Sequence, residues 1–105
     1  MLFIESRIFT RILHDYLSDD DYRELQAYLA ENPGTGDIIQ GTGGIRKVRW
    51  AGSGRGKRGG TRIIYYWQVK DSEVYLLNLY SKGEISDLSA EEKKALKRMV
   101  ETWRQ

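Results

Sequence analysis

Two neighbouring segments, 61–69 and 74–80, are apolar at almost every position, and they restrict the fold of this chain more than any other feature. Both are rich in β-branched and aromatic residues, a composition typical of central strands that are buried on two faces. Asp71 and Ser72, which lie between them, favour a hairpin turn. We therefore expect an antiparallel sheet with helices packed against it.

Three helices are predicted from hydrophobic spacing and from capping residues. Residues 8–17 place large apolar side chains at helical intervals. Ser18 and the aspartates after it favour the start of a second helix, which the Asn-Pro-Gly sequence at 32–34 ends. A serine-to-glutamate capping box that begins at Ser89 predicts a C-terminal helix.

Further strands are predicted at 38–40 and 45–51, and residues 3–5 favour a short one. The predicted fold class is α+β, with two N-terminal helices, an antiparallel or partly mixed sheet of about four strands, and a C-terminal helix. Two hydrophobic cores of ordinary size do not fit in 105 residues, so we expect residues 1–105 to form a single domain.

Residue types and motifs that the sequence lacks exclude several kinds of site. There is no cysteine, which excludes disulfides, thiolate nucleophiles and cysteine zinc sites. The longest apolar stretches are too short to span a bilayer and the N-terminus does not resemble a signal peptide, so we expect a cytoplasmic protein without membrane contact. The Gly-Thr-Gly-Gly sequence at 41–44 lacks the lysine and spacing of a phosphate-binding loop, so no nucleotide cofactor is expected.

Neither a metal site nor a histidine-based catalytic triad is expected. Asp19, Asp20 and Asp21 fall in the first turn of a predicted helix, where the helix dipole explains acidic residues. His14 is the only histidine and lies on a predicted helix away from the basic strands. Any catalysis must therefore use other side chains.

The cations of the chain are concentrated in its middle third. No acidic residue occurs between Asp37 and Asp71, although the net charge of the whole chain is only +2. A basic region on a nearly neutral background is typical of a protein that binds a polyanion, and nucleic acid is the expected partner. The cations of this block are Arg46, Lys47, Arg49, Arg55, Lys57, Arg58, Arg62 and Lys70.

Strand alternation predicts which cations share a face. Lys47 and Arg49 are expected on one face of the strand 45–51, and Arg46 on the other. On the last strand, the side chains of residues 74, 76, 78, 80 and 82 are expected to lie on one face, with residues 80 and 82 at the exposed end of the strand. If the three strands are neighbours, one basic surface contains Lys47, Arg49, Arg62, Tyr80 and Lys82.

Each of these features also has a purely structural explanation. The glycine-rich basic loop 52–60 can be a solvated turn, and charged residues can alternate with apolar ones on any half-exposed strand. Tyr80 can be a strand-end aromatic residue whose hydroxyl meets water. The three tryptophans are expected to pack in the core rather than to stack on bases. The convergence of the cations in one acid-free segment favours the functional interpretation.

The sequence resembles a known family, the RelE/HigB-type toxins of bacterial toxin–antitoxin modules, and it is most similar to the HigB branch. The resemblance covers essentially the whole chain. It is sharpest at 37–49 (DIIQGTGGIRKVR), 56–67 (GKRGGTRIIYYW) and 77–89 (LNLYSKGEISDLS). It implies a microbial RNase-like fold, cleavage of ribosome-bound messenger RNA, and no cofactor. It also implies neutralisation by a cognate, HigA-like antitoxin with a helix-turn-helix domain, and contact with operator DNA only through that antitoxin.

The resemblance assigns roles to the basic residues. Lys47, Arg49 and Arg62 match positions that contact and stabilise the scissile phosphate in RelE-like toxins. The other cations of the block are expected to bind RNA or the ribosome; they are Arg46, Arg55, Lys57 and Arg58.

Two positions depart from the family pattern. RelE toxins have an arginine directly after the lysine that matches Lys82, and this chain has Gly83 there. They also have a catalytic tyrosine where this chain has Ser89. Tyr80 is the nearest aromatic residue that can replace it, with Lys82 beside it.

The nuclease activity that the resemblance implies requires no metal, because RNA carries its own nucleophile, the 2′-hydroxyl. Arg49 and Arg62 are the candidates for stabilising charge on the phosphate. Lys47 or Lys57, each among other cations, is a candidate base, and Tyr80 and Glu84 are competing choices. Two alternatives remain open, which are a non-catalytic RNA- or ribosome-binding module and a gyrase-inhibiting toxin on the same fold.

Overall fold

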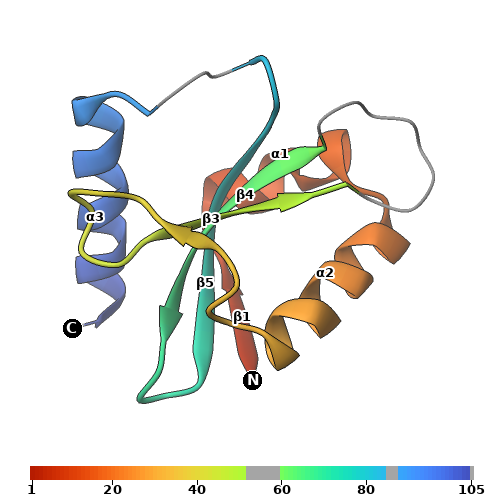
Figure 1. Ribbon diagram of the computed structural model, residues 1–105, viewed down its shortest axis with the longest axis horizontal. Helices are drawn as coiled ribbons and strands as arrows, with labels where there is room; N and C mark the ends of the chain where they lie inside the picture. Colours follow the sequence, from red (N-terminus) through yellow and green to blue (C-terminus); the bar gives the residue numbers. More distant parts are fainter. Residues whose placement is uncertain (52–59, 85–87, 105) are drawn as a thin grey trace.

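The computed structural model describes residues 1–51, 60–84 and 88–104, and these residues form one five-stranded sheet with three helices packed against it (Figure 1). The predicted α+β class is confirmed, and the sheet, expected to have about four strands, has a fifth in the N-terminal segment that the sequence marked as favouring a short strand. In spatial order the strands are β1 (Leu2–Glu5), β5 (Glu73–Ser81), β4 (Thr61–Gln68), β3 (Arg46–Trp50) and β2 (Asp37–Ile38).

The described residues form three helices, of which the second and third begin at the capping residues that the sequence indicated, whereas the first has Ser6 as its N-cap, which the sequence analysis did not single out. They are α1 (Arg7–Tyr16), α2 (Asp19–Glu31) and α3 (Ala90–Arg104). The Ser18 side chain accepts a hydrogen bond from the Asp21 amide at 3.1 Å, which leaves the three aspartates in the first turn of α2. Ser89 and Glu92 form a reciprocal capping box at 2.8 and 3.1 Å. No helix within the described ranges is long and apolar enough to cross a membrane.

The sheet is mixed because β1 runs parallel to β5, whereas every other pair is antiparallel. Strands β3, β4 and β5 are consecutive neighbours, as the predicted basic surface requires. The β4–β5 hairpin turns at 69–72, and Ser72 in this turn has a φ of 53°. The basic strands therefore lie in one continuous part of the sheet.

Each face of the sheet carries its own hydrophobic cluster. On one face, α1 and α2 pack Phe9 and Leu25 against Ile63, Tyr65 and neighbouring apolar residues. On the other face, α3 packs against a cluster with Ile45, Ile64, Tyr75, Leu77, Tyr80, Leu96 and Val100. Figure 1 shows α3 on the opposite side of the sheet from α1 and α2. The burial of β4 on two faces is thus confirmed.

The tryptophans pack as predicted. Trp50 and Trp67 lie against the cluster under α1 and α2, and Trp103 lies against the cluster under α3. The Trp103 ring meets the Tyr75 ring edge-on, with 4.8 Å between the ring centroids.

A bulge in the β4–β5 pair changes the predicted alternation of the last strand. The register runs Ile64↔Asn78 and then Tyr65↔Leu76, so Leu77 is an extra residue. The extra residue reverses which side chains share a face. Leu76 joins the cluster under α1 and α2, while Leu77 and Tyr80 join the cluster under α3. The expectation that residues 74, 76, 78, 80 and 82 share one face is therefore wrong, because residues 74 and 76 lie on the opposite face from residues 78 and 80.

Candidate nucleic-acid interface

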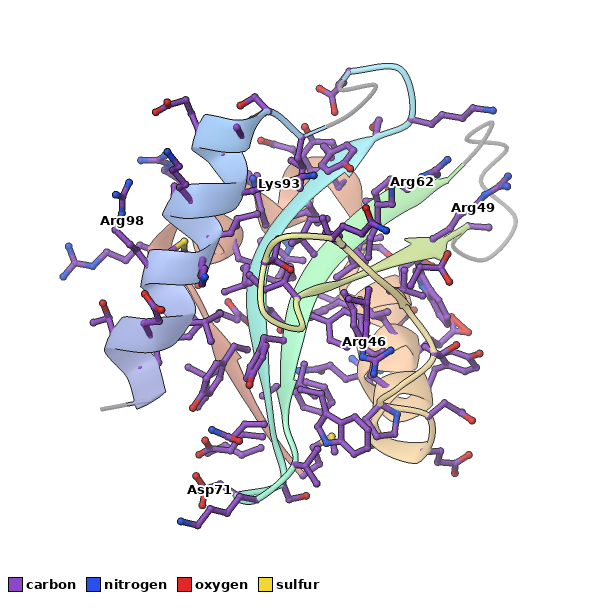
Figure 2. The ribbon with its side chains drawn as sticks, turned by 60° about the vertical axis from the view of Figure 1, so that its left-hand side comes forward. Arg46, Arg49, Arg62, Asp71, Lys93 and Arg98 are labelled. Carbon is purple, nitrogen blue, oxygen red and sulfur yellow. The ribbon has the colours of Figure 1, made fainter. Side chains whose placement is uncertain are left out.

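The register of the three central strands aligns Arg49, Arg62 and Tyr80. Arg49 pairs with Arg62 across β3 and β4, and Arg62 pairs with Tyr80 across β4 and β5. Side chains of directly paired residues lie on the same face of a sheet, about 4.5–5.5 Å apart at Cβ. We call these three residues the arginine row. Figure 2 shows Arg49 and Arg62 on neighbouring strands, at the end of the sheet away from Asp71.

A second row lies two residues along β3, on the same face. Lys47 pairs with Asp37 on one side and with Ile64 on the other, and Ile64 pairs with Asn78. We call Asp37, Lys47, Ile64 and Asn78 the lysine row. Ile64 packs under α3, so both rows belong to the face that α3 partly covers. The structure thus brings Lys47 and Arg49 together on one face, as predicted.

Exposure rises along the arginine row from one strand to the next. The Tyr80 side chain is buried, with 5% of its surface exposed, Arg62 is half-buried, and Arg49 is exposed. The sequence placed Tyr80 at the exposed end of its strand, and that expectation is wrong, because Tyr80 lies on the face that α3 partly covers and packs in the cluster under α3. A partly buried guanidinium has stronger electrostatic interactions than an exposed one, because water screens it less.

Lys82 continues the line of the hairpin beyond the arginine row. Its backbone amide donates a hydrogen bond to the Gly60 carbonyl at 3.4 Å, and its side chain is exposed. Gly60 has a φ of +68°, and a Cβ atom there would lie 2.8 Å from the Trp50 carbonyl oxygen. Only glycine fits this position without strain, so it helps to fix the start of β4, and with it Arg62.

Arg46 lies on the opposite face from Lys47 and Arg49, as its place in the strand predicts. Its Nη1 atom donates to the Gly34 carbonyl at 3.1 Å and to the Gly36 carbonyl at 2.8 Å. The guanidinium therefore ties the segment after α2 to β3. The structure does not bring Arg46, predicted as an RNA contact, into either row.

The substitution Arg46→Ala is expected to reduce the free energy of unfolding by about 1.5–3 kcal/mol, because it removes a charge that bonds two carbonyls. Urea unfolding measures the loss. Arg46→Lys is the matched variant, since it keeps the charge but not the two-carbonyl geometry, and it should recover only part of the loss. Full recovery by lysine would show that charge, and not the paired hydrogen bonds, matters at this position.

Glu84, a candidate base, is held near α1. Its carboxylate accepts hydrogen bonds from the Ser81 amide at 2.6 Å and from the Tyr16 hydroxyl at 2.8 Å. Burial and the hydrogen bond from the phenol to Glu84 both raise the pKa of Tyr16. The phenol therefore keeps its proton and remains the donor. These contacts connect the segment after β5 to the end of α1.

Arg55, Lys57 and Arg58, which the sequence analysis assigned to RNA binding, lie outside the described residues. The same holds for Lys57 as a candidate base.

A pocket of about 240 Å³ adjoins the lysine row. Two of its charged residues, Asp37 and Lys93, were not singled out from the sequence. The helical spacing of Lys93 could have predicted its position. It lies three residues before Leu96 and therefore on the same face of α3, the face that packs against the sheet. Figure 2 shows Lys93 on the side of α3 that faces the sheet, whereas Arg98 points away from it. The described residues that line the pocket are Asp37, Ile38, Ile39, Gln40, Lys47, Leu88 and Lys93.

The two rows combine cations, a phenol and an amide on one face of a rigid sheet. Two guanidinium groups on paired strand residues can each donate two hydrogen bonds to the oxygens of a phosphate. Strand residues hold such groups more firmly than loop residues do.

The family model described as the RelE toxin of the RelE/RelB toxin–antitoxin system matches residues 3–105, and this match does not distinguish branches within the family.

Proposed function

The chain belongs to the RelE toxin family, and from that premise we propose that it is a metal-independent endoribonuclease that cuts messenger RNA on the ribosome. Toxins of this family inhibit translation, are generally endoribonucleases and act with an antitoxin partner. The observation that carries the proposal for this chain is the arginine row, with Lys47 two residues along on the same face.

The proposed cleavage step needs no metal ion, because the RNA supplies the nucleophile. The 2′-oxygen gives up its proton and attacks the adjacent phosphorus while the bond from phosphorus to the 5′-oxygen breaks. The 5′-oxygen leaves as a hydroxyl after gaining a proton, and the phosphate becomes a 2′,3′-cyclic phosphate. The nonbridging oxygens gain charge in the transition state. Arg49 and Arg62 are paired across neighbouring strands, so they can bind these oxygens together. Donors that are fixed before the reaction stabilise such charge at little reorganisation cost.

The site is less well equipped for proton transfer than for stabilising charge on the phosphate. Lys47 is the nearest candidate to take the proton of the 2′-hydroxyl, because it lies on the same face two residues from Arg49. Tyr80 is paired with Arg62 and is the competing candidate, with Lys82 beyond it along the hairpin. His14, the only histidine of the chain, lies on α1 and on neither row. We therefore infer that the ribosome supplies much of the rate by holding the messenger in line for attack.

The proposed partner is an antitoxin with a helix-turn-helix domain, and the toxin would reach operator DNA only through it. The exposed Arg49 on β3 and Lys82 just after β5 give the two sides of the arginine row a positive surface. An acidic segment of the antitoxin that covers this surface would block the messenger from the site.

We expect Lys47→Ala to reduce cleavage of translated messenger RNA by about 100-fold, the lower part of the range for loss of a proton-transfer group. Primer extension on a reconstituted translation reaction measures the cuts. Lys70→Ala is the matched control, because Lys70 belongs to the same acid-free block but is exposed in the β4–β5 turn. Equal losses in the two variants would mean that total charge matters and that position on the sheet does not.

A further inference from the structure

The pocket beside the lysine row contains polar groups that the proposed cleavage step does not use. Asp37 enters from β2, Lys93 from α3, and Gln40 from the segment after β2. Lys47 lines the same pocket and also lies on the same face of the sheet as the arginine row, two residues from Arg49. The pocket is therefore continuous with the place where the scissile phosphate is proposed to bind.

The charged side chains of this pocket have spare hydrogen-bonding capacity. Asp37 and Lys47 are direct register partners, yet they form no ion pair within 4 Å. Across the described part of the chain, no side-chain hydrogen bond or ion pair engages Asp37, Lys47 or Lys93. Asp37 is exposed, and both lysines are half-buried. A carboxylate and two ammonium groups thus remain available to a ligand.

The remaining walls of the pocket are apolar. Ile38, Ile39 and Leu88 contribute to the lining, and the Ile39 and Leu88 side chains also pack against the cluster under α3. Sites for flat organic ligands combine apolar walls with polar groups at fixed places, and four of the seven described residues that line this pocket are polar. Unstacked RNA bases are held in this way, between apolar surfaces and with hydrogen bonds to their edges.

We propose that this pocket binds the nucleobase next to the scissile phosphate and that Asp37 makes it selective for guanine. The proposal rests on the proposed nuclease function, because it places the base relative to that phosphate. Guanine has two adjacent N–H donors on its Watson–Crick edge, which match the two oxygens of a carboxylate. Its neighbouring carbonyl oxygen accepts a hydrogen bond, which Lys93 or the Gln40 amide can donate. Adenine, cytosine and uracil lack the two adjacent donors.

The test compares nucleotide preferences at the cut sites of wild-type protein and Asp37→Asn. Primer extension is performed in a reconstituted translation reaction, with messengers that contain each of the four bases on both sides of many candidate cuts. Wild type should favour guanine at one fixed position next to the cut by about 5- to 100-fold, the discrimination of one bidentate base contact. Asp37→Asn should reduce that preference to about threefold or less and should raise the share of adenine, because a carboxamide matches the donor and acceptor of adenine.

Asp71→Asn is the matched control, since Asp71 is an exposed aspartate in the β4–β5 turn at the far end of the sheet (Figure 2). It should leave the base preference unchanged. Cuts by wild type without a guanine preference, or with a preference that Asp37→Asn does not alter, would overturn the proposal and leave the nuclease function standing.

A second measurement keeps the two proposals separable. Guanosine 3′-monophosphate and its adenosine counterpart are titrated separately into isotope-labelled wild-type protein, and amide chemical shifts are followed. If the protein makes no cuts under any condition, the nuclease function fails, and this titration alone decides the pocket. Shifts around Asp37 and Lys93 that guanosine causes at lower concentration than adenosine support the pocket. Equal shifts, or none, overturn it.

Discussion

Replacing Arg62 by alanine should reduce cleavage of ribosome-bound messenger RNA by about 100- to 1,000-fold, the effect of removing one fixed donor from a charge-stabilising site. Arg62 occupies the middle of the arginine row, with Arg49 as its partner on β3 and Tyr80 as its partner on β5. It is the half-buried member of the two arginines, so its charge is less screened by water. Primer extension of messenger ends in a translation reaction measures the loss.

Arg98→Ala is the matched control for this prediction. Arg98 is exposed on α3 and points away from the sheet, so its loss removes the same charge without touching either row (Figure 2). It should retain cleavage to within about twofold, because exposed charges far from a reaction site are screened. A similar loss in both variants would contradict the assignment of the arginine row.

The same Arg62→Ala variant distinguishes an enzyme from a module that only binds RNA. If Arg62 acts mainly in the transition state, ribosome binding should fall by much less than cleavage does. Sedimentation with ribosomes measures binding at several salt concentrations, since phosphate contacts weaken steeply with salt. Parallel losses of binding and cleavage would favour a role in affinity alone.

Phe9→Ala should lower the free energy of unfolding by about 3–5 kcal/mol, which is a large part of the about 5–15 kcal/mol typical of a single domain. The Phe9 side chain is fully buried beneath α1, and its ring centroid lies 5.9 Å from that of Tyr22 on α2. The substitution leaves a cavity where the two N-terminal helices meet the sheet. Urea unfolding followed by circular dichroism measures the change.

Ile8→Ala serves as the control for the core prediction. Ile8 is the preceding residue on the same helix and its side chain is 42% exposed. Truncation of the Ile8 side chain should lower the free energy of unfolding by about 1 kcal/mol or less, because little buried apolar surface is lost. If both substitutions had the same cost, the described orientation of α1 would be incorrect.

The parts of the fold that the sequence predicted well are those that local chemistry determines. The caps at Ser18 and Ser89 depend on side chains within three residues of each other, and both helices begin where expected. Continuous apolarity predicted the central position of β4, because only a strand between two layers can bury both of its faces. The position of Lys47 and Arg49 on one face of the sheet requires only an unbroken strand, and β3 is unbroken.

The parts that were wrong or missed depend on contacts distant in sequence. The bulge at Leu77 has no glycine or proline to signal it, and one extra residue changes the face of every earlier residue on β5. The burial of Tyr80 depends on its packing against residues of α3, a separate element. The pairing of Asp37 with Lys47, and the approach of Lys93 to both, join three separate elements. No spacing rule within one element predicts such a pocket.

The central claim is that this protein cuts messenger RNA and depends on the ribosome to do so. The most direct test maps RNA ends by primer extension after wild-type protein is added to one messenger, with and without translating ribosomes. We predict cuts within codons that require ribosomes and that disappear with Arg62→Ala. Equally fast cutting of free RNA by the purified protein would contradict ribosome dependence, and the absence of cuts under both conditions would contradict the nuclease assignment itself.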